Sequence, residues 1–144
     1  MYLTHTRPDL CYAVSVASRF MDQPHEIHWK VAKRILNFAQ GTRTHGILYK
    51  ANSELELIGF TDSDWAGDST DRKTTSGYVF MLVEGPISWS SNKQSAIALS
   101  STEAEYRGVV NATTQCLSLQ GLLGECGFKP EYSATIYYDN QSTI

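Results

Sequence analysis

The 144-residue sequence has few cysteines, no long apolar run and no excess of positive charge. Its three cysteines are an odd number without a C-x-x-C pair, which argues against a disulfide framework and against a zinc site. No apolar segment approaches the ~18 residues of a membrane-spanning helix, and residues 1–10 lack the apolar core of a signal peptide. We therefore expect buried, unpaired thiols in a reducing compartment and no membrane partner.

Several functional classes are also disfavoured by what is missing. Twelve basic and fifteen acidic residues give a formal net charge of −3, so a contact with nucleic acid needs a local basic patch or bound cations. The chain contains no G-x-S-x-G, no P-loop and no G-x-G-x-x-G, which disfavours serine hydrolases and nucleotide-cofactor enzymes. All four histidines lie within residues 5–45, upstream of the candidate acidic residues Asp62, Glu105 and Asp139.

The first third of the chain has the apolar spacing of two helices. Apolar residues recur at three- and four-residue steps over 8–21 and again over 25–40, which predicts a helical hairpin. The second helix carries a basic side with Lys30, Lys33 and Arg34. That side is either an ordinary solvated face or a surface that contacts phosphates.

The pattern changes to short strands near Gly46. The sequence predicts strands over 46–50, 55–61 and 134–138, a hairpin over 77–90 that turns at 84–86, and a helix from about 100 to 123. Hairpins followed by a strand–helix–strand crossover indicate an α/β fold with a mixed sheet covered by helices. The chain then divides into a helical connecting segment, residues 1–45, and a sheet domain, residues 46–144.

Acidic residues stand directly after two predicted strands. Asp62 follows an apolar strand, Asp64 lies on the same face if that strand continues, and Asp139 follows the last strand. For Asp62 the alternative is a turn-forming aspartate that ends the strand. For Asp139 the alternative is the N-cap of a following helix.

A third acidic position heads the inward side of the long predicted helix. Glu105 begins a stripe at steps of four and three residues that is otherwise apolar: Val109, Ala112, Cys116, Leu119 and Leu123. Its alternative role is a capping box with Thr102. Glu103 lies on another face and is expected to be solvated.

Two strand ends and one helix N-terminus can meet at one end of a sheet. Three carboxylates gathered there would repel each other unless cations held them, and hard oxygen ligands suit Mg²⁺ or Mn²⁺. A carboxylate cluster of this kind is what two-metal phosphodiester chemistry requires. Asp62, Glu105 and Asp139 are therefore the predicted metal ligands, with Asp64 as the rival to Asp62.

Five motifs occur in order along the sheet domain: GFTDSDWAGD at 59–68, DRKTTSGY at 71–78, ISWSSNKQ at 87–94, SSTEAEY at 100–106 and YDNQS at 138–142. Together they resemble the ribonuclease H domain of copia-type long-terminal-repeat retrotransposon Pol polyproteins. Upstream, TRPDL at 6–10, HWKVAKRIL at 28–36 and GT at 41–42 resemble the segment that joins the reverse transcriptase to that domain.

The resemblance implies a fold, an activity and a set of residues. The fold is a ribonuclease H-like mixed sheet whose first three strands are antiparallel and whose fourth is parallel, flanked by helices. The activity is cleavage of the RNA strand of RNA–DNA hybrids with Mg²⁺ or Mn²⁺, in which Asp62, Glu105 and Asp139 match the family's carboxylates. Hybrid recognition is by shape and phosphate contact, for which the candidates are Arg72, Lys73, Lys93 and Gln94.

The resemblance also implies a place and partners, and it leaves alternatives. The partners are an RNA–DNA hybrid and the reverse transcriptase domain of the same polyprotein, in a cytoplasmic particle or the nucleus of a cell. The chain stops at Ile144, before the fourth carboxylate that the family carries, so we expect an incomplete domain. The alternatives to an active nuclease are a non-catalytic remnant that retains some affinity for nucleic acid, and a module whose helical segment docks on the polymerase.

Overall fold

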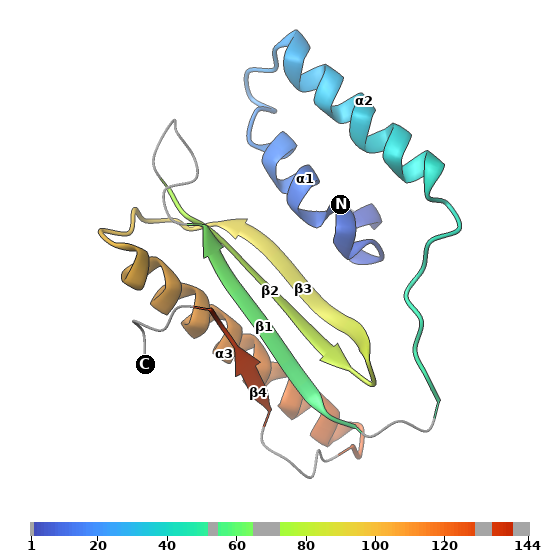
Figure 1. Ribbon diagram of the computed structural model, residues 1–144, viewed down its shortest axis with the longest axis vertical. Helices are drawn as coiled ribbons and strands as arrows, with labels where there is room; N and C mark the ends of the chain where they lie inside the picture. Colours follow the sequence, from blue (N-terminus) through green and yellow to red (C-terminus); the bar gives the residue numbers. More distant parts are fainter. Residues whose placement is uncertain (1, 52–54, 65–72, 129–133, 140–144) are drawn as a thin grey trace. The chain divides into compact units, whose positions relative to one another are not determined.

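The computed structural model describes residues 2–51, 55–64, 73–128 and 134–139. The chain divides into two units, Met1–Ile47 and Leu48–Ile144. The first unit is helical, and the second contains a sheet with a long helix on one face (Figure 1).

The first unit is the helical hairpin that the sequence predicts. A short 3-10 helix η1 (Tyr2–His5) precedes α1 (Pro8–Ser18) and α2 (Glu26–Gly41), and α1 packs against α2. Arg7 joins the two ends of the hairpin: its guanidinium forms an ion pair with Asp9 at 2.7 Å and donates to the Thr42 hydroxyl at 2.6 Å. At the other end the rings of Phe20 and His28 stack with their centroids 4.0 Å apart.

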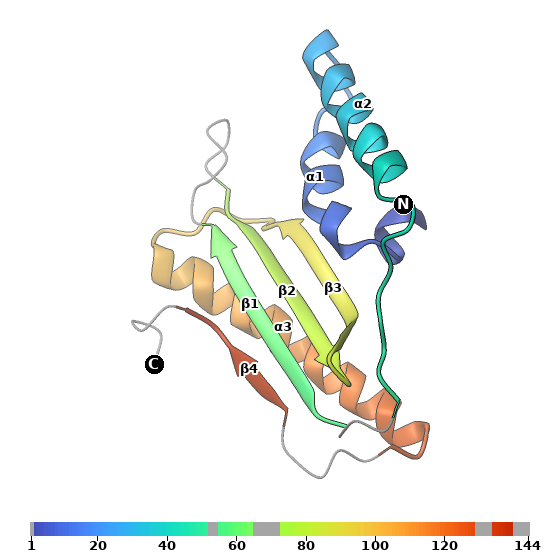
Figure 2. The ribbon, with the colours of Figure 1, turned by 45° about the vertical axis from the view of Figure 1, so that its right-hand side comes forward.

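The second unit is a mixed four-stranded sheet. Strands β1 (Leu57–Asp64), β2 (Thr75–Leu82) and β3 (Gly85–Lys93) are antiparallel, and β4 (Thr135–Tyr137) is parallel to β1. The strand order is β3-β2-β1-β4, and α3 (Ser101–Glu125) crosses one face of the sheet (Figure 2). This confirms the predicted α/β fold with three antiparallel strands and a parallel fourth.

The apolar core lies between α3 and the sheet. Leu57, Phe80, Ala112 and Cys116 are its buried members. Strand β1 alternates between buried and exposed side chains, as a strand with one covered face does. Gly59 lies on the covered face, where a Cβ would stand 2.6 Å from the Phe80 ring. The ring of Phe80 therefore fills the space that a side chain at position 59 would need.

Two local predictions are wrong. Residues 46–50 form no strand: Tyr49 donates a hydrogen bond to the Pro86 carbonyl at 2.7 Å, and Lys50 forms an ion pair with Glu84. The hairpin turns at Val83 and Glu84, both at positive φ (54° and 60°), instead of at 84–86. Positive φ in both loop residues matches the right-handed twist of a two-residue hairpin, although a β-branched residue rarely adopts it.

The structure tests two expectations from the composition: that the thiols are buried, and that no helix spans a membrane. Cys116 is buried, Cys11 is half-buried and Cys126 is exposed, and all three are unpaired. The expectation of buried thiols is therefore correct for Cys116, and wrong for Cys126. Within the described ranges, no helix has both the length and the apolarity needed to cross a membrane.

Candidate metal centre

Three carboxylates from three different elements meet at one end of the sheet. Asp62 lies on β1, Glu105 is in the second turn of α3, and Asp139 follows β4 by two residues. One carboxylate oxygen of each lies within 4.8 Å of the other two. Because β1 and β4 are parallel, the C-terminal ends of both strands lie at this end of the sheet. The structure thus brings together the three residues that the sequence predicts as a group.

Glu105 is the buried member of this cluster. It is only 6% exposed, whereas Asp62 and Asp139 are exposed. Burial raises the pKa of the Glu105 carboxyl, the charges of Asp139 and Asp62 raise that pKa further, and the backbone N–H of Ser63 lowers it. In the described part of the chain, its Oε2 has no hydrogen-bond partner. A buried acceptor without a donor is costly, and a cation would satisfy it.

The beginning of α3 shows why Glu105 is available. Ser100 is the N-cap, and its hydroxyl accepts from the Glu103 N–H at 3.1 Å. The Glu103 carboxylate accepts from the Leu99 N–H at 2.7 Å and from Arg107 at 2.6 Å. Ser100 and Glu103 therefore make the capping contacts, with the Glu103 carboxylate bound to the N–H of Leu99, the residue before the N-cap. The alternative of a capping box between Thr102 and Glu105 is wrong. Glu103 lies on another face and is partly exposed to solvent, and it pairs with Arg107.

Asp62 and Asp64 lie two residues apart on the same exposed face of β1. The strand continues through Asp64, so Asp62 does not end it. The Ser63 N–H donates to Asp62 Oδ1 at 2.7 Å, which fixes the carboxylate beside the backbone. Asp62 belongs to the three-carboxylate group and Asp64 does not. The geometry therefore favours Asp62, and a metal-binding role for Asp64 stays a prediction.

Asp139 lies at the end of the described chain segment 134–139 and is exposed. A role as the N-cap of a following helix concerns residues 140–144, which lie outside the described ranges. Its position within 4.8 Å of Asp62 and Glu105 is independent of that question.

The four residues predicted to contact nucleic acid have different surroundings. Arg72 lies outside the described residues, whereas Lys73 and Lys93 are half-buried near one end of β2 and β3. Gln94 is only 8% exposed, and its amide donates to the Ser76 hydroxyl at 2.5 Å and to the Ala104 carbonyl at 3.0 Å. Its side chain is thus used inside the protein, so we leave Gln94 out of the surface considered for nucleic acid.

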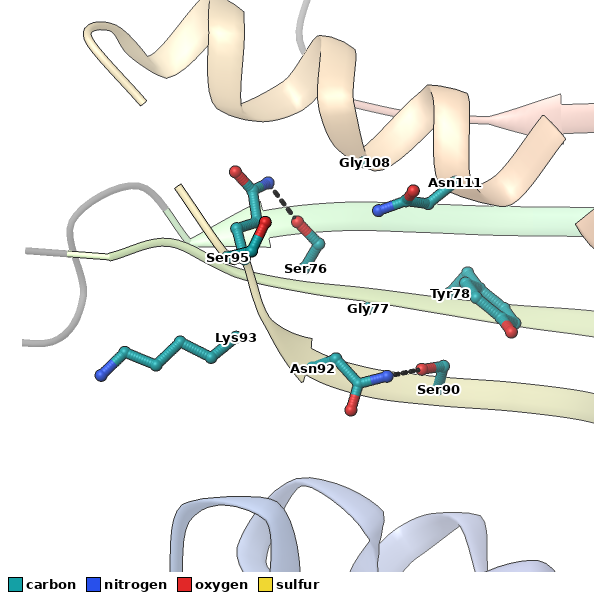
Figure 3. Close-up of a pocket in the computed structure, with 10 residues that line it drawn as sticks. Ser76, Gly77, Tyr78, Ser90, Asn92, Lys93, Ser95, Gly108 and Asn111 are labelled. Carbon is teal, nitrogen blue, oxygen red and sulfur yellow. Dashed lines mark hydrogen bonds between the residues drawn. The ribbon is translucent and has the colours of Figure 1, made fainter. Parts of the chain in front are cut away.

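A polar pocket of about 430 Å³ lies between β2, β3 and α3 (Figure 3). Hydroxyl and amide groups dominate its walls, with one lysine, and none of the described residues that line it is acidic. Asn92 donates to the Ser90 hydroxyl at 2.7 Å on one wall, and Asn111 stands on the helix wall opposite. Hydroxyl and amide groups of this kind can hydrogen-bond sugar hydroxyls and phosphate oxygens.

A buried polar layer beneath the first turns of α3 is not predicted from the sequence. Thr61, Ser63, Thr74 and Gln94 are all less than 9% exposed. One signal was visible: the covered face of β1 changes from Leu57 and Gly59 to hydroxyl residues as the strand approaches Asp62. The glutamine gave no such signal, because its burial depends on contacts with two other elements.

No family model matches the chain, and no solved structure matches it significantly. Curated proteins do. The chain is 45% identical over 139 residues to the retrovirus-related Pol polyprotein from transposon RE2 of Arabidopsis thaliana, and 42% identical over 140 residues to that from transposon TNT 1-94 of Nicotiana tabacum. Each match covers 96% of the chain and 10% of the polyprotein.

A shorter relative matches as well. The secreted RxLR effector protein 161 of Plasmopara viticola is 46% identical over 120 residues, which is 83% of the chain and 84% of that protein. The chain spans about a tenth of the length of the Pol polyproteins that it matches. It belongs to the family that these retrovirus-related Pol polyproteins of transposons represent.

Proposed function

We propose that this chain is a metal-dependent nuclease that cleaves the RNA strand of RNA–DNA hybrids during reverse transcription of a retroelement. The observation that carries the proposal is the cluster of Asp62, Glu105 and Asp139, whose carboxylate oxygens lie within 4.8 Å of one another. The relationship to Pol polyproteins supports a retroelement context. The mixed sheet with a parallel fourth strand is consistent with the ribonuclease H-like fold that the motifs suggest.

The donor set fits Mg²⁺ or Mn²⁺. Both ions prefer carboxylate oxygens, and the three residues offer nothing else. Glu105 is buried with one oxygen that has no partner among the described residues. A bound ion would supply that partner and offset the repulsion among the three charges.

Each carboxylate has a distinct part in such a centre. Glu105 is held by the packing of α3 and provides the least mobile ligand, Asp62 is oriented by the Ser63 N–H, and Asp139 closes the cluster from the β4 side. When bound, the ion supplies the positive charge that activates a water molecule and stabilises the leaving oxygen of a phosphodiester. Arg72, Lys73 and Lys93 are the proposed phosphate contacts, and the pocket beside β3 offers hydroxyl and amide groups to the sugar-phosphate backbone.

The test is cleavage of a labelled RNA–DNA hybrid by the full chain with Mg²⁺, in parallel with Asp62→Asn and Asp64→Asn. The two substitutions remove the same charge from the same exposed face of β1, two residues apart, so they form a matched pair. We expect cleavage by the wild type and by Asp64→Asn, and a loss of at least 100-fold with Asp62→Asn. Single-stranded RNA and double-stranded DNA of the same sequence serve as substrate controls.

Other results would lead to different conclusions. A loss confined to Asp64→Asn would make Asp64 the ligand from β1. Binding of the hybrid without cleavage by a folded wild-type chain would contradict the proposal and favour a non-catalytic remnant.

We also propose that the first unit docks on the polymerase part of such a polyprotein. No residue of α2 is buried, and large apolar side chains on it are exposed: Ile27, Trp29, Val31, Leu36 and Phe38. Exposed apolar surface of this kind marks interaction sites. The Pol polyproteins that match the chain are about ten times longer than the match, so most of each polyprotein lies outside the matched segment and offers surface to cover this helix.

A further inference from the structure

Gln94 links the sheet to the first turns of α3. It follows β3, and its amide Nε2 donates both to the Ser76 hydroxyl on β2, at 2.5 Å, and to the Ala104 carbonyl on α3, at 3.0 Å. The Ser76 hydroxyl is itself 3.0 Å from the Ser63 hydroxyl on β1. Gln94 therefore connects α3, at the residue that precedes Glu105, with β2 directly and with β1 through the Ser76 hydroxyl.

The glutamine is fixed at its backbone as well. Its N–H donates to the Thr74 carbonyl at 2.8 Å, and Thr74 is fully buried. Gln94 itself is 8% exposed. Because both the backbone and the side chain of Gln94 are hydrogen-bonded in a packed interior, the residue has little conformational freedom. It therefore fixes the position of the helix relative to the strands.

The helix approaches β1 very closely at this point. A Cβ on Gly108 would stand 2.5 Å from the Ser63 hydroxyl oxygen. Ser63 is the neighbour of Asp62, and Gly108 lies one turn beyond Glu105. Ser63, Ser76 and Gln94 thus form a polar contact between the sheet and α3 directly beside Asp62 and Glu105.

We propose that Gln94 is a positioning residue for the carboxylate cluster: through the Ala104 carbonyl it holds the Glu105 carboxylate at the distance from Asp62 that a divalent cation requires. This inference rests on the proposed function. The Gln94 Oε1 atom is buried and has no partner in the described part of the chain, which is costly for stability. The amide is thus used through its Nε2, whose two donated hydrogen bonds join Ser76 to the Ala104 carbonyl.

The test compares Gln94→Met with Gln115→Met in the full chain. Methionine keeps the length of glutamine and removes its hydrogen bonds. Gln115 is a matched control because it also joins α3 to the sheet, donating to the Ser88 hydroxyl at 3.2 Å, ten residues beyond Glu105. Affinity for Mn²⁺ is measured by calorimetry without substrate, and amide hydrogen exchange is followed over residues 104–108.

We expect Gln94→Met to weaken Mn²⁺ binding about tenfold, as loss of an outer-shell contact does, and to speed exchange at 104–108. Gln115→Met should change Mn²⁺ affinity less than twofold. If Gln94→Met fails to fold, Ser76→Ala takes its place in the test. This variant removes the other acceptor of the Gln94 amide and should also weaken Mn²⁺ binding. Equal Mn²⁺ affinity of the wild type and a folded Gln94→Met would overturn the positioning role while leaving the metal site in place.

The two proposals can fail separately. If the wild type binds no Mn²⁺, the proposed metal centre fails, and hydrogen exchange alone then decides whether Gln94 orders the first turns of α3. Unchanged exchange at residues 104–108 in Gln94→Met would overturn that ordering role.

Discussion

At the residue scale, Glu105 is the group on which the candidate site most depends. Its carboxyl is buried beside two other acids, and both burial and these charges raise its pKa. The folded chain therefore binds a proton at Glu105 more tightly than the unfolded chain does. Ionisation of Glu105 then opposes folding, and this opposition grows as the pH rises from the unfolded-state value of about 4.3 through the raised folded-state pKa.

A Glu105→Gln substitution should consequently stabilise the metal-free chain at neutral pH. We expect its free energy of unfolding in EDTA to exceed that of the wild type at pH 7.5, because the amide carries no charge to desolvate or repel. The difference should shrink as the pH falls through about 4, because Glu105 then becomes protonated in the unfolded state as well. Urea denaturation of both proteins at several pH values measures it.

The same pair of proteins separates a metal site from a merely acidic one. Millimolar Mg²⁺ or Mn²⁺ should stabilise the wild type at pH 7.5 by mass action and should stabilise Glu105→Gln much less. A wild type that is more stable than Glu105→Gln in EDTA at pH 7.5 would show that the buried carboxylate is satisfied without a cation. Asp64→Asn is the control for a general charge effect, because it removes an exposed carboxylate that lies outside the cluster.

At the element scale, the packing of α3 against β1 depends on a helix residue without a side chain. Gly108 is buried, and a Cβ there would stand 2.5 Å from the Ser63 hydroxyl. Glycine inside a helix costs about 1 kcal/mol relative to alanine. The close approach of helix and strand offsets this intrinsic cost at position 108.

Two Gly→Ala substitutions in α3 should therefore act in opposite directions. Gly108→Ala should lower the free energy of unfolding by about 1–3 kcal/mol, because the core is overpacked. Gly121→Ala, where nothing lies within 4 Å of the added Cβ, should raise it by about 0.5–1 kcal/mol. Thermal or urea unfolding of both variants is the measurement. A stabilising Gly108→Ala would show that the helix has room to move away from Ser63.

Elements with strong local signals could be predicted from the sequence, and those that depend on distant contacts could not. The helical hairpin and α3 have apolar periodicity, and the carboxylates could be grouped because strand ends and a helix N-terminus share one edge. The turn at Val83 and Glu84 was misplaced, because nothing local indicates positive φ at a valine. The pattern of residues 46–50 predicts a strand, but Tyr49 and Lys50 contact the hairpin from outside the sheet, and the sequence gives no local sign of these distant contacts.

At the scale of the whole molecule, the candidate site belongs to one unit. Asp62, Glu105, Asp139 and Gln94 all lie in Leu48–Ile144, together with the apolar core around Phe80. The first unit contributes its own internal contacts, such as those of Arg7 with Asp9 and Thr42. The two proposed roles, hydrolysis and docking, are thus assigned to different units.

Removing the first unit should leave the metal centre intact. We expect a chain of residues 48–144 to unfold cooperatively and to bind Mn²⁺ within about twofold of the affinity of the full chain, measured by calorimetry. The polymerase portion of a Pol polyprotein should raise the unfolding temperature of the full chain and leave that of residues 48–144 unchanged, because the exposed apolar side chains of α2 are absent from the shorter chain. Loss of Mn²⁺ binding by a folded 48–144 chain would mean that the metal centre depends on the helical hairpin. Hydrolysis and docking could then not be assigned to separate units.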